Sequence, residues 1–196
     1  MRERPILFSG PMVRAILAGH KTQTRRVAKE FAGRDDLDAV LTRFPNQSGC
    51  PYGAPGDRLW VRESTHRRPM LNLLTGEPLA DKYDGGAYTA DGADVLTPEG
   101  FDLAWWYSRK SCPSIHMPRF ACRLVLEVTS VRVERLNEIS QEDAELEGVE
   151  CNMSPLSFRE HFQRLWEHLN GAESWDANPW VWVVEFRRAE DGGAHG

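Results

Sequence analysis

Runs of residues that favour β-strands recur along the chain. Segments rich in β-branched, aromatic and other apolar residues predict strands at 5–9, 57–63, 122–134 and 180–186. In the third of these, Leu124, Leu126 and Val128 share one face of a long strand, or of two strands joined by a bend. The last run is almost continuously apolar, which predicts a strand covered on both faces. Residues 21–27 are predicted to be a polar extended segment.

Helices are predicted from end signals and from apolar spacing. The first begins after Gly10-Pro11 and ends at Gly19, the second lies between the capping residue Ser140 and Gly148, and the third lies between Ser154-Pro155 and Gly171. Apolar residues in the third helix recur at helical spacing from Phe158 to Leu169. We therefore expect that face to pack in the core.

Two polar stretches interrupt these elements. Residues 28–55 are charged and then rich in Gly, Pro, Asn and Ser, which predicts a surface loop with a short helix near 36–43. Residues 64–118 combine many turn residues with scattered aromatic residues and a short strand candidate at 86–90. We predict an irregular, aromatic-rich insertion that packs as a lid or binding loop. The glycine-rich residues 189–196 are predicted to be a disordered tail.

These elements together predict an α+β fold in a single domain over residues 1–188. About five or six strands are expected to close into a mixed β-barrel, with about three helices outside it. The length of 196 residues and the hydrophobic share of 41% allow one full core without disulfides or metal.

The net charge argues against bulk binding of nucleic acid, and the short apolar runs argue against a membrane protein. The formal net charge is −5, so the chain is not expected to coat nucleic acid through bulk electrostatics. A nucleic-acid role would have to rest on a local basic site, for which Lys21, Arg25 and Arg26 are the candidates. The alternative for these three is an ordinary solvated face. The apolar runs are too short to cross a bilayer and a signal peptide is not evident, so we expect a cytoplasmic protein without a membrane partner.

The cysteines do not form a recognisable framework. Cys50, Cys112, Cys122 and Cys151 are scattered without a CxxC pair, which argues against both a secreted disulfide scaffold and a zinc knuckle. A weaker alternative is a composite metal site in which Cys50, Cys112 and His116 converge. We expect neither a metal nor a cofactor.

The segment after the first predicted helix carries the most distinctive chemistry. Lys21 and Thr24 stand three positions apart, and a buried lysine can lose its proton near neutral pH and act as a base toward a hydroxyl. In a regular strand these positions face opposite sides, so a shared site requires a turn or bulge. A helix C-terminus also favours a charged lysine, which opposes base duty. The plain alternative is that both are exposed loop residues.

Four motifs in order resemble signatures of the ASCH family, the small β-barrel relatives of the PUA RNA-binding domain. They are the Ile-Leu-Ala-Gly-x-Lys-Thr-x-Thr run within 16–26, the Gly-Asp-Arg-Leu-Trp-Val-Arg-Glu run at 56–63, the helix containing 144–149, and the closing run at 182–186. The segments 50–53 and 113–119 look like those of a longer subgroup found in phages and prophages. The resemblance implies a PUA-like barrel with a ribonucleoside- or RNA-directed cleft.

A small bacterial member of that family removes the acetyl group from N4-acetylcytidine, and its lysine, threonine and glutamate match Lys21, Thr24 and Glu147. The resemblance implies that Thr24 attacks the amide carbonyl, that Lys21 is its base, and that Glu147 carries the proton to the leaving amine. Arg26 would steady the oxyanion or the substrate. Without the family, Glu147 is one of several carboxylates on an acidic, solvated helix.

Other functions stay open. In a non-catalytic RNA-binding module, the basic residues would grip phosphate and the insertion aromatics would stack on unpaired bases. The residues expected to contact a modified nucleoside or single-stranded RNA are Thr22, Arg25, Arg26, Trp60, Arg62, Trp105 and Trp106. A ribonuclease would use His20 and His116 as its candidates, and a role in virion assembly is a further alternative. The sequence leaves the oligomeric state open.

Overall fold

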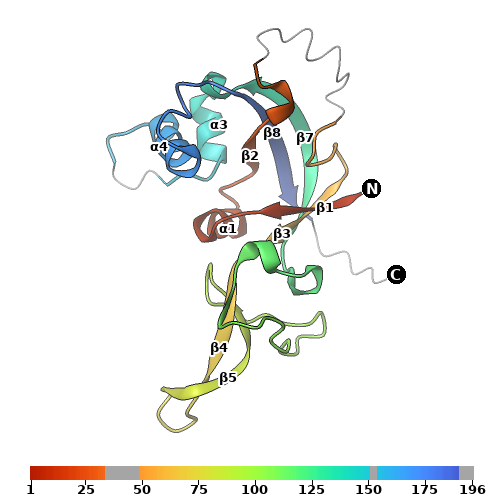
Figure 1. Ribbon diagram of the computed structural model, residues 1–196, viewed down its shortest axis with the longest axis vertical. Helices are drawn as coiled ribbons and strands as arrows, with labels where there is room; N and C mark the ends of the chain where they lie inside the picture. Colours follow the sequence, from red (N-terminus) through yellow and green to blue (C-terminus); the bar gives the residue numbers. More distant parts are fainter. Residues whose placement is uncertain (34–48, 151–153, 190–196) are drawn as a thin grey trace. The chain divides into compact units, whose positions relative to one another are not determined.

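The computed structural model describes residues 1–33, 49–150 and 154–189 (Figure 1). The chain packs as two compact units. Unit 1 consists of Met1–Arg4, Ala15–Leu59 and Leu126–Gly196, and unit 2 consists of Pro5–Arg14 and Trp60–Val125. The helix near 36–43, the tail from 190 onward and Cys151 lie outside the described residues. Within the described part, no helix has the length and apolar character needed to span a membrane.

Five strands form one sheet in the order β1-β3-β7-β8-β2. Their bounds are Glu3–Leu7 for β1, Gln23–Val27 for β2, Arg58–Arg62 for β3, Val125–Arg135 for β7 and Trp180–Arg188 for β8. In the described chain β1 and β2 are the two edges of this sheet, so the prediction of a closed barrel is wrong. The predicted α+β class is confirmed. The predicted strands at 5–9, 57–63, 122–134 and 180–186 each lie at one of these five strands, within a few residues.

The helices of the described chain are α1 at Gly10–Leu17, α3 at Gln141–Leu146 and α4 at Phe158–Asn170. The predicted ends of α1 and α3 are confirmed by positive φ angles at Gly19 (80°) and Gly148 (75°). The predicted start of α4 is wrong. Its N-cap is Ser157, which forms a reciprocal capping box with Glu160, and not the Ser-Pro pair three residues earlier.

In unit 1, helices α3 and α4 pack against one face of β8. The shared core contains Leu136, Ile139, Ala144, Phe162, Trp166, Trp175, Val181 and Val183. Alternate residues of a strand face opposite sides, so Trp182 and Val184 lie on the other face of β8. All four of these β8 residues are buried, which confirms the prediction of a strand covered on both faces.

Antiparallel pairing places β2 against β8 with Thr24 opposite Val184 and Arg25 opposite Val183. Neighbours across an antiparallel pair share a face. Arg25 therefore lies on the face that carries α3 and α4, and Thr24 lies on the opposite face. This register decides which side chains of β2 can meet the helices.

Unit 2 is more regular than the sequence suggests. Strands β4 at Thr65–Leu71, β5 at Pro78–Tyr88 and β6 at Ser111–Cys112 form a second sheet in the order β5-β4-β6. Residues 64–118, predicted as an irregular insertion with short strand candidates, therefore contain three paired strands. Pairing between β4 and β5 holds the weak strand formers of β5 in place, with register shifts at Pro69. A small core beneath them contains Tyr88, Val95, Met117 and Ala121.

Candidate functional site

Lys21 follows the turn that ends α1. The amides of His20 and Lys21 both donate to the carbonyl of Ala15, at 2.9 and 3.1 Å, so the chain reverses just before β2. Lys21 then forms an isolated antiparallel bridge with Glu147. The Thr22 amide donates to the Leu146 carbonyl at 3.0 Å. These backbone bonds join the start of β2 to the end of α3.

Glu147 is placed by the short helix α3. The Ser140 hydroxyl accepts a hydrogen bond from the Asp143 amide and begins the helix, and Glu147 caps its C-terminal end. Gly148 follows in a left-handed conformation. A Cβ atom at Gly148 would lie 2.7 Å from the Cβ of Lys21 and 2.9 Å from that of Ala15. Only glycine therefore allows this close approach.

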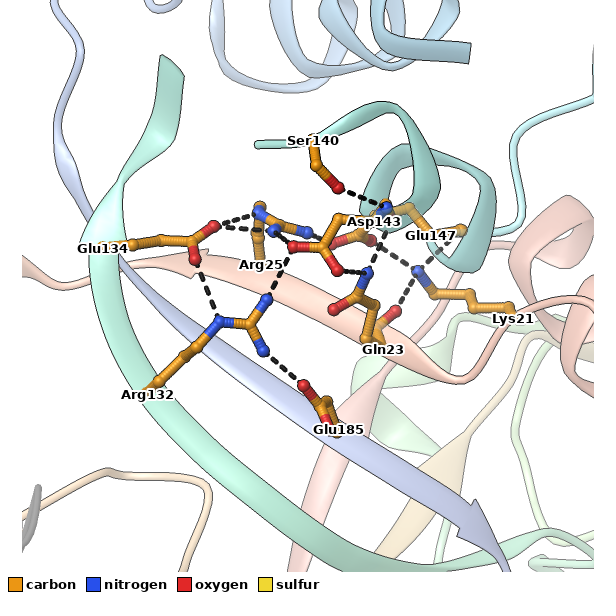
Figure 2. Close-up of polar contacts among 9 residues, drawn as sticks. All are labelled: Lys21, Gln23, Arg25, Arg132, Glu134, Ser140, Asp143, Glu147 and Glu185. Atoms are coloured by element: carbon orange, nitrogen blue, oxygen red, sulfur yellow. Dashed lines mark hydrogen bonds and ion pairs between the residues drawn. The ribbon is translucent and has the colours of Figure 1, made fainter. Parts of the chain in front are cut away.

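The ammonium group of Lys21 is enclosed by acceptors (Figure 2). It donates to Oε2 of Glu147 at 2.8 Å, to the Glu147 carbonyl at 2.9 Å and to the Gln23 carbonyl at 2.8 Å. Lys21 is 2% exposed and Glu147 is 4% exposed. Burial lowers the pKa of Lys21 from its ordinary value, and the charge and hydrogen bond of Glu147 oppose that shift only in part. The site thus holds a lysine that gives up its proton more readily than usual.

The ammonium group lies at the edge of β2 that does not pair with β8, next to the end of α3. The Phe186 amide donates to the Thr22 carbonyl, which continues the ladder with β8 beyond Gln23. Because carbonyls alternate in direction along an antiparallel strand, the Gln23 carbonyl points away from β8 and toward that edge. Lys21 binds this carbonyl, so its nitrogen lies at the rim between the two faces of the sheet. The ladder is regular from Gln23 to Val27, without the bulge that a shared site for Lys21 and Thr24 was expected to require.

Arg25 extends the site into a network of charges. Its guanidinium donates to Oε1 of Glu147 at 3.2 Å, to Oδ2 of Asp143 at 2.7 Å and to Oε1 of Glu134 at 2.6 and 2.9 Å. Its side chain is fully buried. Arg132 of β7 binds the same Glu134 and Asp143 from a more exposed position.

The network continues toward solvent on the side of β7 and β8. Arg132 also pairs with Glu185, which is 40% exposed at its side chain. Gln23 donates from its amide nitrogen to Oδ1 of Asp143 at 3.0 Å. Burial raises the pKa of Asp143, but the hydrogen bond from Gln23 and the charges of Arg25 and Arg132 outweigh it, so the pKa is lowered from 3.8.

The structure thus brings both Lys21 and Arg25 into contact with Glu147, whereas Thr24 is buried on the opposite face of β2 from Arg25. Arg26 is half-buried at the next position and shares the face of Thr24. Thr22 is half-buried as well. The remaining binding candidates belong to unit 2 and are partly exposed: Trp60, Arg62, Trp105 and Trp106.

Sequence reasoning missed the charged partners of Arg25. Glu134 and Asp143 stand 109 and 118 residues away from it, and only the fold brings them together. Gln23 offered a local signal, because it alternates with Lys21 and Arg25 along one strand. Asp143 stands three residues after the capping residue Ser140, where helix capping by itself explains a polar residue.

Two alternative sites receive little support. His20 and His116, the ribonuclease candidates, are both exposed, and His116 stacks on Tyr107 with 5.6 Å between the ring centroids. Across 1–33, 49–150 and 154–189, no three His, Cys, Asp or Glu side chains gather as a possible metal site. Cys50 is buried, which raises the pKa of its thiol to about 11 and disfavours the thiolate that a metal would need.

Fold and site define an α+β protein with a buried lysine–carboxylate pair at the edge of a sheet. The chain is similar to an ASCH domain from Lactobacillus crispatus JV V101, at 12% identity and a TM-score of 0.44, over 95% of this chain and 79% of that one. It is also similar to a protein of the family DUF984 from Enterococcus faecalis V583, at 9% identity and a TM-score of 0.43, over 100% of this chain and 86% of that one. No family model and no curated protein sequence matches the chain.

Proposed function

We propose that this chain is an amide hydrolase of the ASCH family that acts on N4-acylated cytidine or a closely similar modified nucleoside. The observation that carries the proposal is the enclosed contact of 2.8 Å between Nζ of Lys21 and Oε2 of Glu147. A lysine and a carboxylate held together away from water form a pair between which a proton can move. The proposed substrate class comes from the resemblance of the N-terminal motif, which contains Lys21 and Thr24, to the ASCH family.

A purely structural role explains this pair less well. Removing two charges from water costs several kcal/mol for each ion, and apolar residues of similar volume often serve stability as well or better. Groups whose pKa values are shifted by burial and by a specific partner are enriched at active sites. Lys21 meets both conditions, since burial is the largest influence on its pKa and Glu147 is its charged partner.

The proposed reaction requires the side chains of Lys21 and Thr24, which face opposite sides of the chain, to meet across the edge of β2. Neutral Lys21 takes the proton of the Thr24 hydroxyl, whose oxygen attacks the amide carbonyl and forms a tetrahedral oxyanion. Arg26, on the same face as Thr24, stabilises that oxyanion. Glu147 passes the proton to the exocyclic nitrogen as the C–N bond breaks, which releases cytidine. Water then hydrolyses the acyl-threonine ester and yields the carboxylic acid.

The test is release of cytidine from N4-acetylcytidine by the purified chain. We expect turnover by the wild type and its loss in Lys21→Ala, Thr24→Ala and Glu147→Gln. The matched controls are Lys29→Ala and Glu145→Gln, because both side chains belong to unit 1 and are exposed. Circular dichroism and thermal melting verify that each variant is folded. A folded wild type that releases no cytidine would overturn the proposal.

Binding of single-stranded RNA is a second candidate, favoured by contacts among aromatic rings and guanidiniums in unit 2. The guanidiniums of Arg62 and Arg119 lie 5.4 and 6.0 Å from the ring centroid of Trp60. Trp106 and Phe120 pack edge to face at 5.8 Å, and Phe120 is 59% exposed. Aromatic rings beside guanidiniums suit unpaired bases and their phosphates.

RNA binding by these aromatic side chains can be tested separately from hydrolysis. A fluorescently labelled single-stranded RNA titrated with the protein should bind more weakly as salt rises, and Phe120→Ala should weaken binding further. Lys21 and Arg25 are already bound by carboxylates, so they contribute little free charge to a phosphate. Lack of binding at low salt would remove this candidate.

A further inference from the structure

We infer that Arg25 is a positioning residue, which fixes the carboxylate of Glu147 in the orientation that meets Lys21. Its effect on turnover rests on the function proposed above, whereas its effect on Lys21 does not. The sequence suggested that Arg25 contacts substrate or phosphate, but its fully buried side chain and its carboxylate partners argue for an internal role.

The two oxygens of Glu147 are held by two different cations. Lys21 takes Oε2 at 2.8 Å, and Nη1 of Arg25 takes Oε1 at 3.2 Å. A carboxylate bound at only one oxygen can turn about its last side-chain bond, but one bound at both oxygens from different residues is fixed. Arg25 therefore supplies the second anchor that keeps Oε2 directed at the Lys21 nitrogen.

Arg25 is itself held by the surrounding elements. Glu134 of β7 accepts from both Nε and Nη2, and Asp143 of α3 accepts from Nη2. The guanidinium carbon also lies 5.9 Å from the ring centroid of Phe162 in α4. A planar fork is needed to reach Glu134, Asp143 and Glu147 at once, and a lysine ammonium cannot reproduce it.

The charge of Arg25 also acts on Lys21. Burial is the main cause of the lowered pKa of Lys21, and the positive charges of Arg26 and Arg25 lower it further against the attraction of Glu147. Removing the charge of Arg25 should raise that pKa. The charged and titratable groups around the site are Arg25 and Arg26 on β2, Asp143 and Glu147 on α3, Arg132 and Glu134 on β7, and Glu185 on β8.

Two substitutions separate the anchoring role from the charge. Arg25→Lys keeps the positive charge but loses the fork, so Glu147 should turn away from Lys21, the midpoint of Lys21 should move to lower pH, and turnover should fall about 100-fold, as expected for a misplaced catalytic group. Arg25→Gln also loses the charge, so its Lys21 midpoint should lie at higher pH than that of Arg25→Lys, and turnover should fall as well.

The matched control is Arg187→Gln. Arg187 is an arginine of β8 whose exposed side chain pairs with Glu127, outside the charge network around Glu147. This variant should leave both the Lys21 midpoint and turnover close to wild type. A merely structural role for Arg25 would predict equal losses of stability in the Arg25 variants without any change in the Lys21 midpoint.

The primary measurement is the ¹³Cε chemical shift of Lys21 against pH by nuclear magnetic resonance, which does not depend on a substrate. The second is the pH profile of cytidine release. An unchanged Lys21 midpoint or full turnover in folded Arg25→Lys would overturn the inference. If wild type shows no turnover but the Lys21 midpoint moves as expected, the proposed function fails and the positioning role stands.

Discussion

Oε2 of Glu147 lies 2.8 Å from Nζ of Lys21, across 126 positions of sequence, and both side chains are almost sealed from water. The pair joins the turn after α1 to the end of α3, so it links two elements that are otherwise distant in the chain. Its burial makes each partner depend on the other, because a lone buried charge is far more costly than a paired one.

This dependence gives a first prediction. Lys21→Met should lower the free energy of unfolding by about 3 kcal/mol or more, as when one partner of a buried pair is removed. The double variant Lys21→Met/Glu147→Leu should recover much of that loss, although it should be inactive. Urea unfolding followed by circular dichroism measures all three proteins. Losses that simply add in the double variant would show that the two residues do not stabilise each other.

A second prediction concerns the glycine beside the pair. Gly148→Ala should destabilise the chain and disturb Lys21, because the added Cβ would meet the Cβ atoms of Lys21 and Ala15 at under 3 Å. Gly19→Ala is the matched control, since Gly19 also has positive φ but its Cβ would meet nothing within 4 Å. Thermal melting and the Lys21 chemical shift compare them. Equal effects of the two substitutions would mean that backbone strain alone matters.

The third prediction is a loss of stability in acid that Asp143 helps to cause. Its pKa is lowered in the folded chain, so its contribution is complete above its ordinary value of 3.8 and is lost as pH falls through the folded value. Asp143→Asn should be less stable near neutral pH and should show a flatter decline below about pH 4. Glu145→Gln, exposed on the same helix, should decline as wild type does.

A fourth prediction tests the nucleophile. Thr24→Val preserves the shape of a side chain that is 3% exposed but removes its hydroxyl, so cytidine release should be abolished. Thr24→Ser restores a hydroxyl and should retain part of the turnover. Rapid-mixing experiments should also detect an acyl-enzyme in wild type. Turnover by a folded Thr24→Val protein would assign the attack to a water molecule.

Much of the fold follows from local signals in the sequence. Gly19 and Gly148 end their helices where left-handed residues are needed, and the alternation through Leu126 identifies β7. The start of α4 could also have been predicted, because Ser157 and Glu160 form a capping box. The prediction instead placed the start too early, at the Ser-Pro pair three residues upstream. Strand β5 was harder, since it contains Asp81 and Gly85, which both have positive φ angles, and its strand character depends on the pairing of their neighbours with β4.

The candidate site likewise contains residues that the sequence identified and residues that only the fold brings into it. Lys21, Thr24 and Glu147 were found through a family motif, and the contact between the first and last lies in the structure. Whether that contact carries a reaction stays a prediction. The burial of Arg25 was not predictable, because an arginine in a polar run resembles an exposed residue until its distant carboxylates are known. Local sequence indicates which secondary structure a segment favours. Whether a charged side chain is buried depends on partners that the fold brings from distant positions.

Helix α3 has six residues, from Gln141 to Leu146. Helices much shorter than about 12 residues do not persist alone in water, so this one forms only while its neighbours hold it. It carries Asp143 and ends at Glu147, which means that the same charges assemble the site and fold the helix. Neutralising these charges should therefore expose residues 141–147 to amide hydrogen exchange before the rest of unit 1 unfolds. The site would then be lost through a reversible local unfolding of this one helix.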